Sequence, residues 1–234
     1  MKTIDYLGHS GFLVETDRAI LLFDYFRGGL SLLDRKPAEK PLFVFVSHAH
    51  ADHFNPEIFS LANGARRVKY ILSFDLKGNG AVPGRADVLF TDAEMTCDVD
   101  GLGTVRTLRS TDEGVAFLVT TPDGTFFHAG DLNWWDWPGE DPEWLAEQET
   151  VFRREIGKLA GVPIDAAFVV LDDRLEENYA KGLALFLSVC RPACVLPMHF
   201  WKDRRIVERF KALACPGAAE TEILDTAAET HWEL

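Results

Sequence analysis

The chain has 234 residues, 47% of them hydrophobic, and a formal net charge of −13 at pH 7. This length and composition support a substantial core, and we expect one domain over residues 1–234 because no Ser/Gly/Pro-rich linker interrupts the sequence. The negative charge disfavours nucleic acid as a partner, and the lack of any run of 18 apolar residues disfavours a membrane.

The cysteines and the first residues indicate the compartment. Cys97, Cys190, Cys194 and Cys215 form no C-x-x-C pair, and three of them lie in apolar segments where reduced thiols are common. Residues 1–5 lead directly into strand-like sequence, without the apolar region of a secretory signal. We therefore expect a cytoplasmic protein that acts on a small-molecule substrate. The sequence does not determine its oligomeric state.

Apolar runs and turn residues predict the secondary structure. We expect strands at residues 12–16, 19–23, 42–46, 68–72, 115–120, 125–129, 166–171 and 194–198. Helical patterns predict helices at residues 56–62, 142–159, 176–190 and 203–213. Two hairpins, each containing Phe-Leu-Val and each followed by an aspartate (Asp24 and Asp131), suggest two related halves. This mix of elements predicts two packed sheets with helices on their outer faces.

The segment His-Ala-His-Ala-Asp-His at positions 48–53 follows the apolar run 42–46. That run suits a strand buried on both faces, so the cluster lies on a loop at the end of a strand. Imidazole and carboxylate groups are ligands of divalent ions such as zinc. His48 and His50 could bind one ion, while Asp52 and His53 could bind a second. Asn55-Pro56 is a good helix start, but a helix cap needs only one such residue.

Other polar residues also follow apolar strands. They are Asp131, the pair Asp172-Asp173, and His199. Strand ends at one edge of a sheet are places where ligands from distant parts of a sequence converge. We therefore expect these residues to lie near the histidine cluster.

Together, Asp24, the cluster at 48–53, Gly130-Asp131 and His199 resemble the metallo-β-lactamase-fold hydrolase superfamily, in the branch of small cytosolic lactonase-like and phosphodiesterase-like enzymes. The phrases Leu7-Gly8-His9-Ser10-Gly11-Phe12 and Pro197-Met198-His199 strengthen the resemblance. It implies an α+β fold, an αββα sandwich of two mixed sheets with helices outside. It also implies that His48 and His50 bind a first metal, that Asp52, His53 and His199 bind a second, and that Asp131 bridges them. Asp24 would support the loop that carries the histidines.

One departure from the family concerns the first metal. The family usually supplies a third histidine from the segment before the bridging aspartate, but this chain has no histidine from 54 to 127. Asp112 or Glu113 could replace it and shift the metal preference from zinc towards manganese or iron. Alternatively, Ser110 fills the space and the first site is weak or empty, or His128 or His9 turns towards it. The sequence predicts one or two divalent ions, with zinc preferred.

The predicted activity is metal-dependent hydrolysis of a small ester, lactone or phosphoester, with Asp52 and Asp131 as catalytic residues. Asp52 would orient the nucleophile or accept its proton. Tryptophans 134, 135 and 137, together with Phe200 and Trp201, could line a pocket. The polar candidates for substrate contact are Asn133, Asp173, Arg174, Tyr179 and Lys202.

Other functions are possible for such a site. The absent third histidine makes a metal-binding protein without turnover, such as a sensor or a non-catalytic relic, the main alternative. Di-iron oxidoreductases of this superfamily place an acid at the second histidine position, so His50 disfavours that class.

Overall fold

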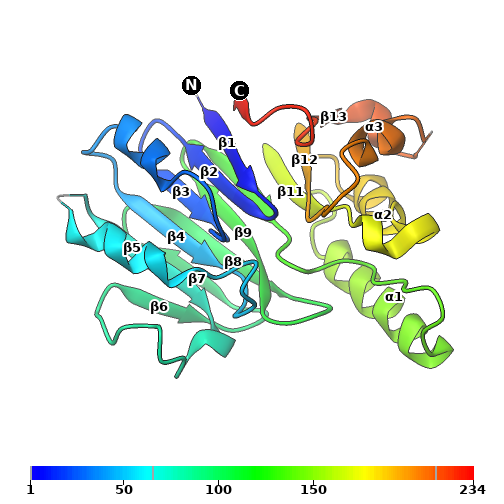
Figure 1. Ribbon diagram of the computed structural model, residues 1–234, viewed down its shortest axis with the longest axis horizontal. Helices are drawn as coiled ribbons and strands as arrows, with labels where there is room; N and C mark the ends of the chain where they lie inside the picture. Colours follow the sequence, from blue (N-terminus) through cyan, green and yellow to red (C-terminus); the bar gives the residue numbers. More distant parts are fainter. Residues whose placement is uncertain (1, 65, 214) are drawn as a thin grey trace.

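A computed structural model describes residues 2–64, 66–213 and 215–234, whose strands form two seven-stranded sheets (Figure 1). The first sheet contains, in spatial order, β14 (His231–Glu233), β1 (Thr3–Gly8), β2 (Gly11–Glu15), β3 (Ile20–Phe23), β4 (Leu42–Val46), β5 (Val68–Ser73) and β6 (Val88–Thr91). The second contains β13 (Glu222–Ile223), β12 (Cys194–Met198), β11 (Ala166–Val170), β10 (Gly124–His128), β9 (Val115–Thr121), β8 (Gly103–Arg109) and β7 (Thr96–Val99).

Both sheets are mixed and follow one plan. The hairpin β2–β3 continues into the parallel strands β4 to β6, and the hairpin β9–β10 continues into the parallel strands β11 to β13. This repetition agrees with the two related halves suggested by the hairpins. In each sheet the parallel strands end at the same edge, so the residues that follow them can meet there.

Aromatic side chains fill the space between the sheets. The ring of Phe12 stacks on Phe168 with 4.2 Å between centroids, and Phe45 meets Phe117 edge-on at 5.3 Å. All four are fully buried. Removing such large rings from water is the main stabilising contribution of a sandwich core, and it fixes the two sheets against each other.

Helices cover the outer faces. The α-helices α1 (Pro142–Gly157), α2 (Lys181–Val189) and α3 (Ile206–Lys211) lie on the side of the second sheet, at the right of Figure 1. Short 3₁₀ helices η1 (Leu30–Arg35), η2 (Pro56–Asn63) and η3 (Phe74–Leu76) pack apolar side chains against the first sheet. The remaining 3₁₀ helices are η4 (Asp173–Asn178) and η5 (Ala218–Glu220). Across the described ranges, no helix has the length and apolar character needed to cross a bilayer.

The helix predictions need three corrections. The segment 56–62 is a 3₁₀ helix, although Asn55 caps it by accepting from the Glu57 amide as expected. The helix expected at 176–190 begins only at Lys181, because Glu176 has a φ of 53° that interrupts helical geometry. The helix expected at 203–213 is shorter, since Asp203 forms a turn by accepting from the Arg205 amide instead.

Ser47, the residue after β4, lies close against two loops of the second sheet. Gly114 and Gly130, from the second sheet, both have positive φ values, 68° and 52°. A Cβ on Gly114 would lie 1.9 Å from the Ser47 carbonyl oxygen, and one on Gly130 would lie 2.7 Å from the Ser47 Cβ. These glycines therefore allow the loop that follows β4 to approach the second sheet.

We predict that Gly114→Ala destabilises the protein by about 3 kcal/mol or more, because the new methyl group must displace the backbone of Ser47. Gly139→Ala is the matched control, since Gly139 also has a positive φ, 85°, but has no atom within 4 Å of an added Cβ. The Gly139→Ala substitution should lower the free energy of unfolding only by the cost of a left-handed conformation for alanine, about 1–2 kcal/mol. Chemical denaturation measures both values, and equal losses would contradict the close approach.

Candidate metal centre

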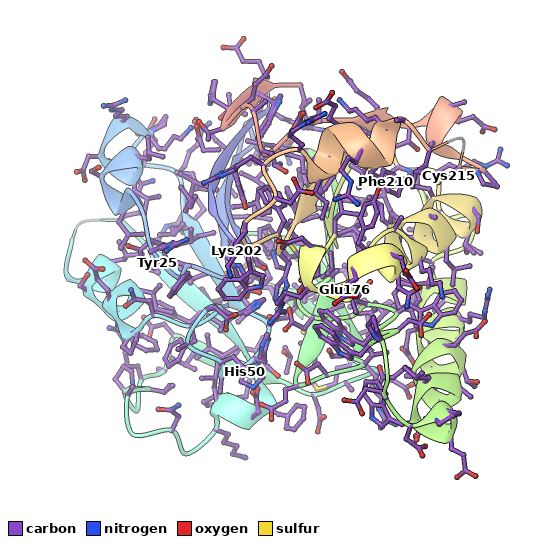
Figure 2. The ribbon with its side chains drawn as sticks, turned by 45° about the vertical axis from the view of Figure 1, so that its right-hand side comes forward. Tyr25, His50, Glu176, Lys202, Phe210 and Cys215 are labelled. Carbon is purple, nitrogen blue, oxygen red and sulfur yellow. The ribbon has the colours of Figure 1, made fainter. Side chains whose placement is uncertain are left out.

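The candidate centre lies on loops at the shared edge of the two sheets. The loop 47–54 follows β4, Asp131 follows β10, and His199 follows β12, while His9 lies in the turn between β1 and β2. His50 and Lys202, labelled in Figure 2, lie on loops in the middle of that view, between the strands of the first sheet and the helices. Residues far apart in the sequence thus meet at one place.

Asp131 is at the middle of the centre. Its Oδ1 lies 3.1 Å from Nε2 of His53 and 3.2 Å from Nε2 of His199, and its Oδ2 lies 3.5 Å from Nε2 of His48. Asp131 Oδ1 and the Nε2 atoms of His53 and His199 are buried without a hydrogen-bond partner. Buried polar atoms normally form hydrogen bonds. These three unpaired atoms are all possible metal ligands and lie close together, which suits a bound cation.

The other ring nitrogens hold these imidazoles in place. Nδ1 of His53 donates to Asp24 at 2.7 Å, and Nδ1 of His199 donates to Asp172 at 2.9 Å. Nδ1 of His48 lies 2.9 Å from the Ser47 hydroxyl, which itself donates to Asp24. A carboxylate can only accept, so Nδ1 of His53 and of His199 carries a proton, and it is their Nε2 atoms that could bind a metal.

The structure brings all six predicted ligands together. Among the residues that the structure describes, three groups have ligand atoms within 4.8 Å of one another: His48, His53 and Asp131; His50, Asp112 and Asp131; and His9, Asp52, His53 and His199. Asp131 belongs to two groups, which is compatible with the bridging role implied by the resemblance. The assignment of each residue as a ligand stays a prediction.

His9 lies with Asp52, His53 and His199, the residues expected to bind the second metal, and not with the group of His50 and Asp112. Its Nε2 lies 3.2 Å from Asp52, and its ring lies 4.2 Å from that of His199. His9 was expected only as a substitute for the missing histidine of the first metal. Like His199, His9 directly follows a strand, and this position could have identified it. The position was overlooked because His9 lies in a hairpin turn.

Among the substitutes for the missing histidine, geometry favours Asp112. Its Oδ2 lies 4.0 Å from Nδ1 of His50. Both nitrogens of His128 are engaged, one with the Ser10 carbonyl at 2.8 Å and one with the Gly130 amide at 3.1 Å. The Ser110 hydroxyl accepts from the Asp112 amide at 3.1 Å.

Glu113 is also close to this group, with an Oε2 3.5 Å from Nε2 of His50. Its side chain is 55% exposed, however, and it belongs to none of the three groups.

Charges in the centre are strongly coupled. Burial lowers the pKa of His48 to about 4, helped by the charge on His53, so His48 is neutral. Burial also opposes a charge on His199, but Asp131 and Asp172 outweigh it and raise its pKa to about 9. The pKa of His53 is likewise raised, by Asp131 and Asp24. In the metal-free chain, protons on these two imidazoles offset the carboxylates, and a cation would replace them.

A cavity of about 230 Å³ opens onto the centre. Its walls combine metal-site residues with an arginine, a threonine and three tryptophans: His50, Asp52, Asp112, Asp131, His199, Thr111, Trp135, Trp137, Trp144 and Arg174. The predicted aromatic wall is therefore present at Trp135 and Trp137. Thr111 and Trp144 had no sequence signal that pointed to the cavity.

Of the predicted substrate contacts, Asn133, Trp134, Asp173 and Lys202 do not line this cavity. Asn133 is buried, and the ring of Trp134 faces Arg153 and Lys181 instead. The carboxylate of Asp173 accepts from the backbone amides of residues 201–203, and Lys202 is exposed on that loop.

Tyr179 is also outside the cavity, since its ring packs under Arg209. Of the polar candidates, only Arg174 lines the cavity.

Comparison with known proteins gives consistent relatives. A family model described as a beta-lactamase superfamily domain matches residues 3–135, more than half of the chain. A Pyrobaculum islandicum protein named UPF0173 metal-dependent hydrolase is 29% identical over 208 residues, covering 84% of this chain and 83% of that protein.

Two solved structures share the fold. Igni18, described as a novel metallo hydrolase from Ignicoccus hospitalis, has a TM-score of 0.63 at 18% identity, covering 100% of both chains. YhfI of Bacillus subtilis, described as a metallo-beta-lactamase fold protein, has a TM-score of 0.63 at 14% identity, covering 99% of this chain and 98% of that chain.

These likenesses confirm the predicted sandwich of two mixed sheets and the resemblance seen in the motifs at 48–53, 130–131 and 199. With a family model covering more than half of its length, the chain belongs to the β-lactamase superfamily, in its metallo-β-lactamase fold.

Proposed function

We propose that this protein is a metal-dependent hydrolase of a small ester, lactone or phosphoester. The main observation behind the proposal is the set of buried, unpaired ligand atoms of Asp131, His53 and His199. Asp131 and His199 also line an open cavity. The name of the Pyrobaculum relative, a metal-dependent hydrolase, supports it. A cavity of about 230 Å³ suits a small substrate.

His53, His199 and Asp131 would hold one metal, with Asp52 and His9 beside it, while His48 lies by the other oxygen of Asp131. A divalent cation there supplies a Lewis acid and makes hydroxide available near neutral pH. Asp52 lines the cavity, and His9, whose Nε2 lies 3.2 Å from its carboxylate, lowers the pKa of Asp52, so Asp52 stays ionised. An ionised carboxylate at the wall can accept a hydrogen bond from the attacking water and orient it.

The open cavity favours turnover over a purely structural site. Structural metal sites are closed by protein ligands, whereas catalytic sites keep an accessible position. Here the Asp52 side chain is 26% exposed and that of His50 is 45% exposed. A sensor or a non-catalytic relic has no evident need for this access.

We infer that Asp112 completes the first metal position with His50 and Asp131. Two carboxylates and few imidazoles make this position richer in oxygen than the second. Oxygen-rich sites accept manganese or iron more readily than sites built from imidazole or thiolate. Zinc remains the preferred ion for the second position, where the imidazoles of His9, His53 and His199 lie together with Asp52.

Loss of Asp131 should abolish activity. We expect the zinc-loaded protein to hydrolyse 4-nitrophenyl acetate or bis(4-nitrophenyl) phosphate, and Asp131→Asn to lower kcat/KM by about 100-fold or more. Asp136→Asn is the control, because Asp136 is in the same loop but pairs with Lys181 outside the cavity. Full activity after complete chelation, or in Asp131→Asn, would refute the proposal.

The role of Asp112 can be tested by metal content. Elemental analysis should give one metal equivalent fewer per chain for Asp112→Ala than for the unmodified protein. Glu113→Ala, a change at the neighbouring carboxylate, should retain the full content. If Asp112→Ala keeps all of its metal, Asp112 is not a ligand.

The charge coupling predicts a pH effect on the metal-free protein. The folded-state pKa of His199 is about 9, above the ordinary value of about 6.5, so protonation stabilises the folded chain. This stabilisation is complete below pH 6.5 and is lost as the pH rises towards 9. Thermal denaturation should therefore show a falling Tm over this range for the metal-free protein and a smaller fall for the zinc-loaded one. Parallel curves would contradict the prediction.

A further inference from the structure

Arg174 is the one Lys or Arg side chain among the residues that line the cavity. It lies in η4, just after β11, and its side chain is 44% exposed. The other charged groups of the cavity wall are the carboxylates of Asp52, Asp112 and Asp131 and the imidazoles of the centre. Any negatively charged part of a substrate that lies away from the metal would therefore meet this guanidinium.

The guanidinium is fixed along one edge. Its Nε lies 3.0 Å from both oxygens of Asp172, and its Nη2 also donates to that carboxylate. Its Cζ lies 5.4 Å from the ring centre of Trp137 and 5.1 Å from that of Trp201. The cation is thus held between two aromatic rings and a carboxylate, so little side-chain freedom is left to lose when a ligand binds.

The other edge is available. Within the described ranges, Nη1 of Arg174 makes no hydrogen bond, although Nε and Nη2 are both used. An arginine needed only to neutralise Asp172 would be satisfied by the edge already engaged. The remaining N–H groups can form charge-assisted hydrogen bonds with an oxyanion.

Asp172 links this arginine to the metal centre. The same carboxylate accepts from Nδ1 of His199 at 2.9 Å, and Nε2 of His199 lies 3.2 Å from Asp131. The guanidinium is therefore held at a set position relative to the metal ligands. An anionic group bound to it would place the rest of a small substrate over Asp131, beside Trp135 and Trp137.

We propose that Arg174 selects substrates that carry an oxyanion, a carboxylate or phosphate group, a few bonds away from the scissile bond. This inference rests on the proposed hydrolase function and specifies its substrate class. Arg174 binds the anion, and Asp172 holds the guanidinium of Arg174 in position. The neutral counterpart of such a substrate offers Nη1 only an uncharged acceptor and binds more weakly.

Matched acetate esters test the proposal on the zinc-loaded protein. The compounds are 4-acetoxybenzoate, 4-acetoxyphenylphosphonate and the neutral 4-acetoxybenzamide, which separate a carboxylate, a phosphorus oxyanion and no charge. We expect Arg174→Gln to lower kcat/KM for the anionic esters about 10-fold or more, mostly through KM, because hydrogen bonds between charged groups are stronger than those between neutral ones. The benzamide should change less than about threefold.

Arg205→Gln is the control for loss of an arginine, since Arg205 is exposed and pairs with Glu208 at 3.3 Å. A purely structural role for Arg174, acting through Asp172 and His199, would lower kcat for all three esters alike and reduce the zinc content. That outcome overturns the proposal while leaving the hydrolase function intact.

A binding measurement separates failure of this inference from failure of the hydrolase function. 4-Acetamidobenzoate and 4-acetamidobenzamide are amide counterparts of the esters, and isothermal titration calorimetry gives their Kd values. The acid should bind about 10-fold more tightly than the amide to the zinc-loaded protein, and Arg174→Gln should remove this difference. If no ester is cleaved but this preference is present, only the hydrolase function fails. If the preference is absent or persists in Arg174→Gln, the inference fails.

Discussion

The buried carboxylate of Asp24 is the constraint on which the site depends. It is inaccessible to solvent and accepts from the Ser47 amide at 2.7 Å, from the Ser47 hydroxyl at 2.6 Å and from Nδ1 of His53 at 2.7 Å. Burying a charge is costly unless hydrogen bonds compensate it, so these three bonds are needed for the folded state itself. They also fix the start of the histidine loop and the tautomer of His53. The stability of the fold and the geometry of the metal centre therefore both depend on Asp24.

The same region contains much of the backbone strain. His9, Asp24 and His199 have φ values of 54°, 39° and 71°, in the left-handed region that L-residues rarely adopt. Each lies where the chain leaves a strand, and the side chains of His9, Asp24 and His199 face Asp52, Ser47 and Asp131, respectively. Such conformations cost of order 1–3 kcal/mol each and persist only where the surrounding structure enforces them. Here the packed aromatic core and the hydrogen bonds of Asp24 and Asp172 provide that enforcement.

Those parts of the site that follow local sequence patterns could be predicted from the sequence. The buried strand before His48 and the polar residues after apolar strands, Asp131 and His199, were visible because burial and strand ends leave a short-range signal. Arg174 lines the cavity, whereas Asp173 and Lys202 do not, because that choice depends on how the loops after β11 and β12 fold onto each other. The helix expected at 176–190 was too long because Glu176 has a positive φ, for which the apolar pattern carries no signal. Tertiary contacts decided which loop residues reach the cavity.

Because the ligands come from both sheets, the metal centre can form only late in folding. His48 and His53 follow a strand of the first sheet, while Asp131 and His199 follow strands of the second, and His9 is separated from His199 by most of the chain. No part of the chain can assemble this centre before the two sheets have docked, and contacts between such distant residues form late. A metal that binds only the docked state stabilises interactions absent from the folding transition state. Its main effect is then to slow unfolding, with little acceleration of folding.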